Sequence, residues 1–160
     1  MSTNAEQAIA IFKKHIGTEE GVGDWHVVTQ EQINQFADAT LDHQFIHIDP
    51  EKSAKLSPYK VTIAHGFLTL SLVVHLGASV PRLADAAYKG VVMGVNYGLD
   101  KVRFPNPVKV NSRIRAKRQL VAADLVNPTT IQLKQLVTIE IDGEAKPGCV
   151  AEQLTRLIYS

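Results

Sequence analysis

The stretch that decides the fold occupies residues 61–81 and reads VTIAHGFLTLSLVVHLGASVP. It contains no Asp, Glu, Lys or Arg, and its hydrophobic residues are spread around all sides of a helix. The His, Thr, Ser and Gly residues within it favour a helix buried in protein over a lone membrane span. A helix that is apolar almost all round must be covered on most of its sides. The sequence therefore predicts one long apolar helix at the centre of the molecule.

The second half of the chain supplies amphipathic strands that can cover this helix. Within residues 108–120, most even positions are apolar and most odd positions are polar, which places one face on a core and the other in water. Residues 131–141 repeat the pattern, Asp142-Gly143 is a hairpin signal, and a last strand is expected over residues 149–157. These elements favour an α+β fold in which a curved antiparallel sheet wraps around the central helix.

A further strand is expected over residues 91–104, and its alternation changes phase. Val95 and Leu99 are at odd positions, whereas Val102 is at an even one. A β-bulge near residues 98–101 would account for this reversal of faces.

The first half of the chain is mostly helical. Residues 5–15 have hydrophobic positions at helical spacing, and residues 25–28 predict a short strand. Thr29 and Gln32 then fit a capping box, in which each side chain bonds the other residue's backbone N–H. The helix that starts there is expected to end at about Ala39.

The overall composition limits the classes of function. The 160 residues form one domain, 1–160, since no repeat or linker divides them. The 17 Lys and Arg residues almost balance 16 Asp and Glu residues, which gives no electrostatic reason to bind nucleic acid or a membrane. Cys149, the single cysteine, excludes an internal disulfide and a cysteine-based zinc site. The polar N-terminus does not resemble a signal peptide, so the cytoplasm is the expected location.

Two polar segments stand out, DHQFIHIDP at residues 42–50 and IAHGFLT at residues 63–69. Both precede or begin the apolar helix, where loops can present polar groups. Taken singly, Asp42 could cap a nearby turn, and His47 could be an outward strand residue between two isoleucines. Pro50 and this alternation argue against a helix around His47. His43 and His75 are not expected to be catalytic, and His75 is expected in the core.

The two segments together resemble the signature of the MaoC-like dehydratases, the (R)-specific enoyl-CoA hydratases of the hot-dog fold. That family has Asp-x-Asn-Pro-x-His, followed by Ile-Ala-His-Gly and hydrophobic residues. The resemblance covers about residues 36–104. Asp42 and His47 keep the family spacing, whereas Gln44 and Phe45 replace Asn and Pro. The resemblance implies a homodimer of the hot-dog fold that hydrates trans-2-enoyl-CoA to (R)-3-hydroxyacyl-CoA.

The residue types fit that chemistry. A carboxylate and an imidazole can hold one water and transfer its protons, so Asp42 and His47 are the predicted acid–base pair. Gly66 lies at the start of the apolar helix, where a free backbone N–H can polarise a thioester oxygen that approaches closely. His65 is predicted to be structural, either bonding the loop or capping the helix.

The remaining predictions concern ligands and partners. Substrate contacts are expected at Gln44, Phe67, Leu68 and Arg103. No cofactor and no metal are expected, and CoA is part of the acyl-CoA thioester substrate. The basic positions of the strand after residue 108 are expected to be solvated or to meet CoA phosphates; they are Lys109, Arg113, Arg115 and Lys117. The alternatives are an acyl-CoA thioesterase and a non-catalytic acyl-binding subunit.

Overall fold

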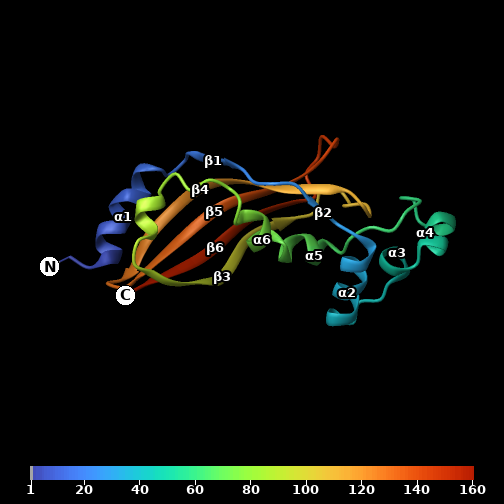
Figure 1. The fold of residues 1–160 in the computed structure, drawn as a ribbon, viewed down its shortest axis with the longest axis horizontal. Coiled ribbons are helices and arrows are strands. Elements are labelled where there is room, and N and C mark those ends of the chain that lie inside the picture. The colour runs from blue at the N-terminus through green and yellow to red at the C-terminus, as the bar shows by residue number, and fades with distance from the viewer. Residues whose placement is uncertain (1) are drawn as a thin grey trace.

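The computed structural model describes residues 2–160, which form one antiparallel sheet with helices over one face and at both ends (Figure 1). The strands are β1 (Glu19–Val22), β2 (His26–Val27), β3 (Val91–Arg103), β4 (Arg113–Asn127), β5 (Thr130–Ile141) and β6 (Cys149–Tyr159). Their order is β1-β4-β5-β6-β3, and β2 also pairs with β4. The four long strands make the body of the sheet, and β3 lies at one edge.

The helices divide between the sheet face and its two ends. They are α1 (Asn4–Lys14), α2 (Gln30–Thr40), α3 (Phe45–Ile48), α4 (Pro50–Leu56), α5 (Gly66–Ser71), α6 (Val73–Gly77) and the 3-10 turn η1 (Asp85–Tyr88). In Figure 1, α5 and α6 lie over the sheet, α1 lies near both termini, and α2, α3 and α4 lie at the opposite end. The helices next to the motif segments are therefore gathered at one end of the sheet.

The alternation predicted for the second half is confirmed. The inward residues of β5 are all buried, namely Ile131, Leu133, Val137, Ile139 and Ile141. The short strand β2 was also predicted, whereas β1 was not. Both pair with β4 and give the sheet an interrupted second edge.

Strand β4 begins later than predicted, at Arg113. The segment before it lies beside the chain that leads into α5. Ala64 N–H donates to the Val108 carbonyl at 2.8 Å, and Val110 N–H donates to the Thr62 carbonyl at 3.0 Å. This short ladder fixes the start of α5 against the sheet.

The bulge predicted in β3 is confirmed by a register shift between Leu99 and Val102. Two further shifts occur, at Val91/Met93 and at Asn96/Gly98. Within the described chain β3 pairs only with β6, so its other edge carries free backbone N–H and C=O groups.

The central helix is not one long helix, which corrects the prediction. Helix α5 ends at Ser71 and α6 begins at Val73, with Leu72 between them. The Ser71 hydroxyl donates to the Phe67 carbonyl at 2.7 Å. A side chain that bonds the carbonyl four residues earlier competes with the helix backbone and often bends it.

Within this chain, only one side of α5 and α6 is packed against other residues. Leu68, Val73 and Leu76 are buried in the core, whereas Phe67 is 68% exposed and Val74 is 61% exposed. His75 is exposed as well, so its predicted core position is wrong. No helix among residues 2–160 combines the length and the apolar content needed to cross a membrane.

Helix α2 begins at the predicted cap. The Thr29 hydroxyl accepts from the Gln32 N–H at 3.1 Å. The reciprocal half of the capping box is wrong, because the Gln32 side chain bonds His26 Nε2 at 2.9 Å instead. A complete capping box is found at α1, between Thr3 and Glu6.

Candidate active site

His47 lies in a single helical turn, α3, so the expectation that no helix forms around it is wrong. Asp49 has an extended backbone, which is the conformation that a residue before proline prefers. Helix α3 therefore ends at Ile48, after a single turn. The His47 carbonyl accepts from Gln30 Nε2 at 2.7 Å. Gln30 also accepts from the buried Thr62 hydroxyl, so α2 and the chain before α5 both hold α3 in place.

The hydrogen bond of His47 shows which of its two ring nitrogens carries the proton when the imidazole is neutral. Its Nδ1 lies 2.7 Å from the Ile63 carbonyl oxygen. A carbonyl oxygen can only accept, so Nδ1 carries the proton and Nε2 keeps a lone pair. Burial lowers the pKa of His47 below its usual value, and the nearby His65 ring also lowers it. The Ile63 carbonyl and the Asp42 carboxylate oppose these effects on the pKa of His47. A neutral imidazole with a free Nε2 suits a base.

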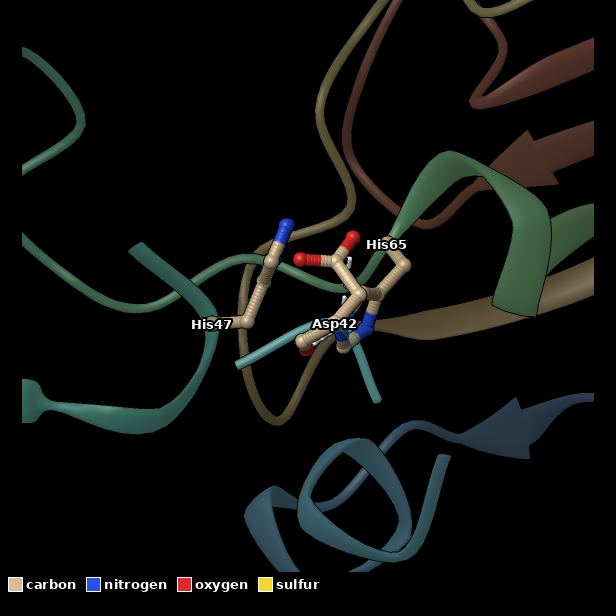
Figure 2. Close-up of side chains that lie close together, drawn as sticks. All are labelled: Asp42, His47 and His65. Atoms are coloured by element: carbon tan, nitrogen blue, oxygen red, sulfur yellow. Dashed lines mark hydrogen bonds and ion pairs between the residues drawn. The ribbon is translucent and has the colours of Figure 1, made fainter. Parts of the chain in front are cut away.

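Asp42 lies in the exposed loop between α2 and α3, close to both histidines (Figure 2). One oxygen of its carboxylate and one ring nitrogen each of His47 and His65 lie within 4.8 Å of one another. Two groups that each bond one water at about 2.8 Å are roughly 4.6 Å apart. The upper limit of 4.8 Å on the separation of Asp42 and His47 is compatible with a single bridging water.

Gly66 begins α5 and lines the same pocket as His47. The pocket has a volume of about 310 Å³. A Cβ on Gly66 would lie 2.9 Å from Cδ2 of Phe104, so the Phe104 ring closes directly over this glycine. Sequence reasoning missed several pocket residues because no local pattern marks them; they are Tyr59, Thr69, Phe104 and Asn106.

His65 is 3% exposed and bonds the loop as predicted. It is the N-cap residue of α5, but its side chain makes no capping hydrogen bond. Its Nε2 lies 3.0 Å from the backbone oxygen of Asp42 and 4.0 Å from the Asp42 carboxylate. Its ring stacks on that of His47, with centroids 3.8 Å apart and planes 23° apart. His65 thus touches both members of the predicted acid–base pair.

The structure does not gather the four predicted substrate contacts into the His47 pocket. Gln44 is exposed beside Asp42, and Phe67 is exposed with its ring 6.0 Å from that of Phe104. Leu68 is buried in the core, and Arg103 is exposed at the end of β3. Contacts of these residues with substrate stay predictions.

The predicted basic row is largely neutralised by cross-strand ion pairs. Arg113 pairs with Asp142, Arg115 with Glu140, and Lys117 with Glu19. Because these side chains already have partners, the arrangement favours a solvated strand face over a phosphate site.

The cluster of Asp42, His47 and His65 could be considered as metal ligands. However, Nε2 of His65 already bonds the Asp42 carbonyl, and Nδ1 of His47 bonds the Ile63 carbonyl. These two bonds occupy one nitrogen of each histidine ring. The absence of a metal stays a prediction.

Known proteins resemble this chain in both sequence and fold. Residues 12–140 match the family described as MaoC like domain. The chain belongs to this MaoC-like domain family. It is 46% identical over 154 residues to 3-hydroxyacyl-thioester dehydratase Z of Mycobacterium tuberculosis, covering 95% of this chain and 97% of that protein. It is 42% identical over 151 residues to nodulation protein N of Rhizobium leguminosarum bv. viciae, covering 94% and 91%.

The MaoC-like chain also resembles the (R)-hydratase from A. caviae involved in PHA biosynthesis. The TM-score is 0.62 at 21% identity, with 84% of this chain and 94% of that chain covered. This likeness confirms the predicted hot-dog fold. Family membership and the dehydratase relative support hydratase–dehydratase chemistry for this chain.

Proposed function

We propose that this MaoC-like protein adds water to trans-2-enoyl-CoA and gives (R)-3-hydroxyacyl-CoA, and that it also catalyses the reverse dehydration. One observation carries the proposal. A ring nitrogen of His47 lies within 4.8 Å of an Asp42 carboxylate oxygen, and Nε2 is the nitrogen of that ring left free by the Ile63 bond. Gly66 lines the same pocket as His47. Asp42, His47 and Gly66 are the proposed catalytic residues.

Each group has a role in the reaction. The water donates one hydrogen bond to the Asp42 carboxylate and one to Nε2 of His47, which leaves an oxygen lone pair free to attack the β-carbon. As the C–O bond forms, the electrons of the C=C bond move onto the thioester oxygen. One water proton passes to the acid–base pair and from it to the α-carbon, and the carbonyl re-forms.

The thioester oxygen carries negative charge between these two steps. The Gly66 N–H is at the first position of α5, where the helix itself provides no acceptor. This N–H would donate to the oxygen and stabilise the enolate-like state. The acyl chain is expected to continue along α5, and the CoA part is expected outside the pocket.

An assay with crotonyl-CoA and longer enoyl-CoAs tests the function. Loss of the conjugated enoyl absorbance without release of free CoA is the expected result, and the product should be the (R)-enantiomer. Free CoA, captured by a thiol reagent, would instead support a thioesterase. Binding of acyl-CoA with no turnover would support a non-catalytic subunit.

Replacing Gly66 by alanine is expected to reduce kcat by at least about 10²-fold, the size typical of a lost oxyanion donor. The N–H remains, but the new methyl group blocks the approach of the thioester oxygen and pushes against Phe104. Steady-state kinetics with crotonyl-CoA measure the effect. Gly66→Ala combined with Phe104→Leu relieves the clash and should restore stability without restoring kcat.

Gly94→Ala is the matched control for the Gly66 substitution. A Cβ on Gly94 would meet its nearest atom at 3.7 Å, an ordinary contact. Its kcat should stay near that of the unmodified protein. Equal losses in Gly66→Ala and Gly94→Ala would argue against a role for the Gly66 N–H.

We further propose a homodimer formed through the free edge of β3. Exposed hydrophobic side chains gather along this strand; they are Val92, Met93, Val95, Tyr97 and Leu99. A second copy of β3 could pair with the free backbone groups in antiparallel fashion and bury these side chains. If the two copies of β3 pair symmetrically about the middle of the strand, Lys101 and Arg103 of one copy lie opposite the uncharged residues at the start of β3 in the other copy. This register therefore brings no like charges together.

Val95→Lys is expected to convert the protein from a dimer to a monomer. The mass in solution should change from about 35 kDa, twice the 17.6 kDa of one chain, to about half that value. Sedimentation velocity measures this change. Val126→Lys is the control, because Val126 on β4 is 44% exposed and Val95 is 43% exposed. A monomeric unmodified protein would refute the proposed homodimer.

A further inference from the structure

We propose that His65 is a positioning residue for both members of the acid–base pair, an inference that rests on the hydratase function proposed above. Its Nε2–H holds the loop that carries Asp42, and its ring holds the ring of His47. The side chain would therefore set the distance between the two groups that share the water, without touching the substrate.

The Asp42 loop has few other attachments. Residues 41–44 are all exposed, and Leu41 has a left-handed backbone with φ of 65°. The Asp42 carboxylate accepts only a long bond from the Gln44 N–H, at 3.4 Å, within its own loop. The 3.0 Å bond from His65 Nε2 to the Asp42 carbonyl joins this exposed loop to the buried start of α5. Without this bond, the loop would keep the exposed contact between His43 and Asp38 but would lose its attachment to the buried start of α5.

The His47 ring is held by two contacts of different kinds. The bond from Nδ1 to the Ile63 carbonyl fixes one point of the ring, and the stack on His65 fixes its plane. His65 is itself held, because the Phe36 ring lies 4.9 Å from it and the side chain is almost fully buried. The direction of the free Nε2 of His47 therefore depends on His65.

The hydrogen-bond pattern of His65 indicates why an imidazole is needed. The Asp42 carbonyl accepts, so Nε2 carries the proton and Nδ1 has an unpaired lone pair. Among the described residues, this Nδ1 is the one buried side-chain nitrogen or oxygen without a hydrogen-bond partner. An unpaired buried acceptor lowers stability. A glutamine could donate to Asp42 and a phenylalanine could stack on His47, but only a ring with an N–H does both.

The two stacked rings also interact electrostatically. A proton added to one imidazole disfavours a proton on the other, and His65 contributes in this way to the lowered pKa of His47. The Asp42 carboxylate acts in the opposite direction, and the Gln30 side chain against α3 is uncharged. Removal of the His65 imidazole should therefore raise the pKa of His47.

Two substitutions separate the contacts of His65. His65→Gln keeps a donor for Asp42, and His65→Phe keeps a ring against His47. Both should move the acid limb of the kcat/KM profile to higher pH, because both remove the second imidazole. We expect kcat to fall about 10- to 100-fold in His65→Phe, with a smaller change in KM, because Asp42 is released. In His65→Gln, which keeps the Asp42 bond but loses the stack on His47, kcat above the acid limb should fall by a smaller factor, about 3- to 10-fold.

A nitrogen-detected NMR titration of His47 in the unliganded protein completes the test, because it does not require turnover. The His47 titration should move to higher pH in both variants, and the loop around Asp42 should lose its single conformation in His65→Phe. His75→Gln, an exposed histidine on α6, is the control and should change neither kcat nor the titration. His65→Leu, which removes both contacts, replaces His65→Phe if that variant does not fold.

The outcomes distinguish the two proposals. An unmodified protein that does not hydrate enoyl-CoA, yet shows the shifted His47 titration in the variants, would refute the function and retain the coupling. Folded His65→Phe and His65→Gln proteins with unchanged kcat and unchanged His47 titration would overturn the positioning role.

Discussion

His47→Gln is expected to reduce kcat for enoyl-CoA hydration by about 10²- to 10⁴-fold, the usual contribution of a general acid–base residue. The glutamine has no nitrogen lone pair that can accept a proton from the bridging water. Stopped-flow or steady-state absorbance with crotonyl-CoA measures the loss. Asp42→Asn should give a loss of similar size, because the amide cannot take the water proton.

The matched control for His47→Gln is His43→Gln. His43 is one residue from Asp42, but its ring points to Asp38, at 2.8 Å, and is exposed. Its kcat should be close to that of the unmodified protein. Near-normal rates in both His47→Gln and Asp42→Asn would show that the site is wrongly assigned.

The pH profile gives an independent check on the same pair. The base form of His47 is neutral, so activity is lost as the pH falls through its pKa. Because burial lowers the pKa of His47, the acid limb should lie below pH 6.5. The Asp42 charge raises the pKa of His47, so the residual activity of Asp42→Asn should have its acid limb at still lower pH.

Glu20→Gln is expected to lower the free energy of unfolding by about 3–5 kcal/mol, the usual effect of removing one partner of a buried ion pair. The Glu20 side chain is 5% exposed and pairs with Arg118, whose side chain is 12% exposed. Arg118 also donates to the Gly77 carbonyl at 3.2 Å, so the pair joins β1 and β4 to the end of α6. Urea unfolding followed by circular dichroism measures the change.

Glu19→Gln is the control for this substitution, since Glu19 is the next residue but is half exposed and pairs with Lys117 at the surface. Its effect should be below about 1 kcal/mol. The double substitution Glu20→Leu with Arg118→Met should recover most of the loss, because a well-packed apolar pair avoids burying an unpaired charge. Equal effects at Glu19 and Glu20 would contradict this account.

The alternation of hydrophobic and polar residues along the sequence was sufficient to predict much of the fold. Alternation over residues 131–141 predicted which face of β5 is buried, and the change of phase after Leu99 predicted a bulge. These predictions succeed because the side-chain period of a strand is a local property of the backbone. The predicted long helix was wrong, since hydropathy does not register a hydroxyl such as that of Ser71 bonding the Phe67 carbonyl.

The sequence by itself determined the family, the spacing of Asp42 and His47, and the place of Gly66 at the start of a helix. Only the tertiary structure decided which nitrogen of His47 is free, because that depends on the Ile63 carbonyl across the pocket. The tertiary structure likewise placed the His65 ring against the His47 ring and within hydrogen-bond distance of the Asp42 carbonyl. Hydrogen bonds between separate segments depend on how the helices and strands pack, and spacing along the chain does not specify that packing.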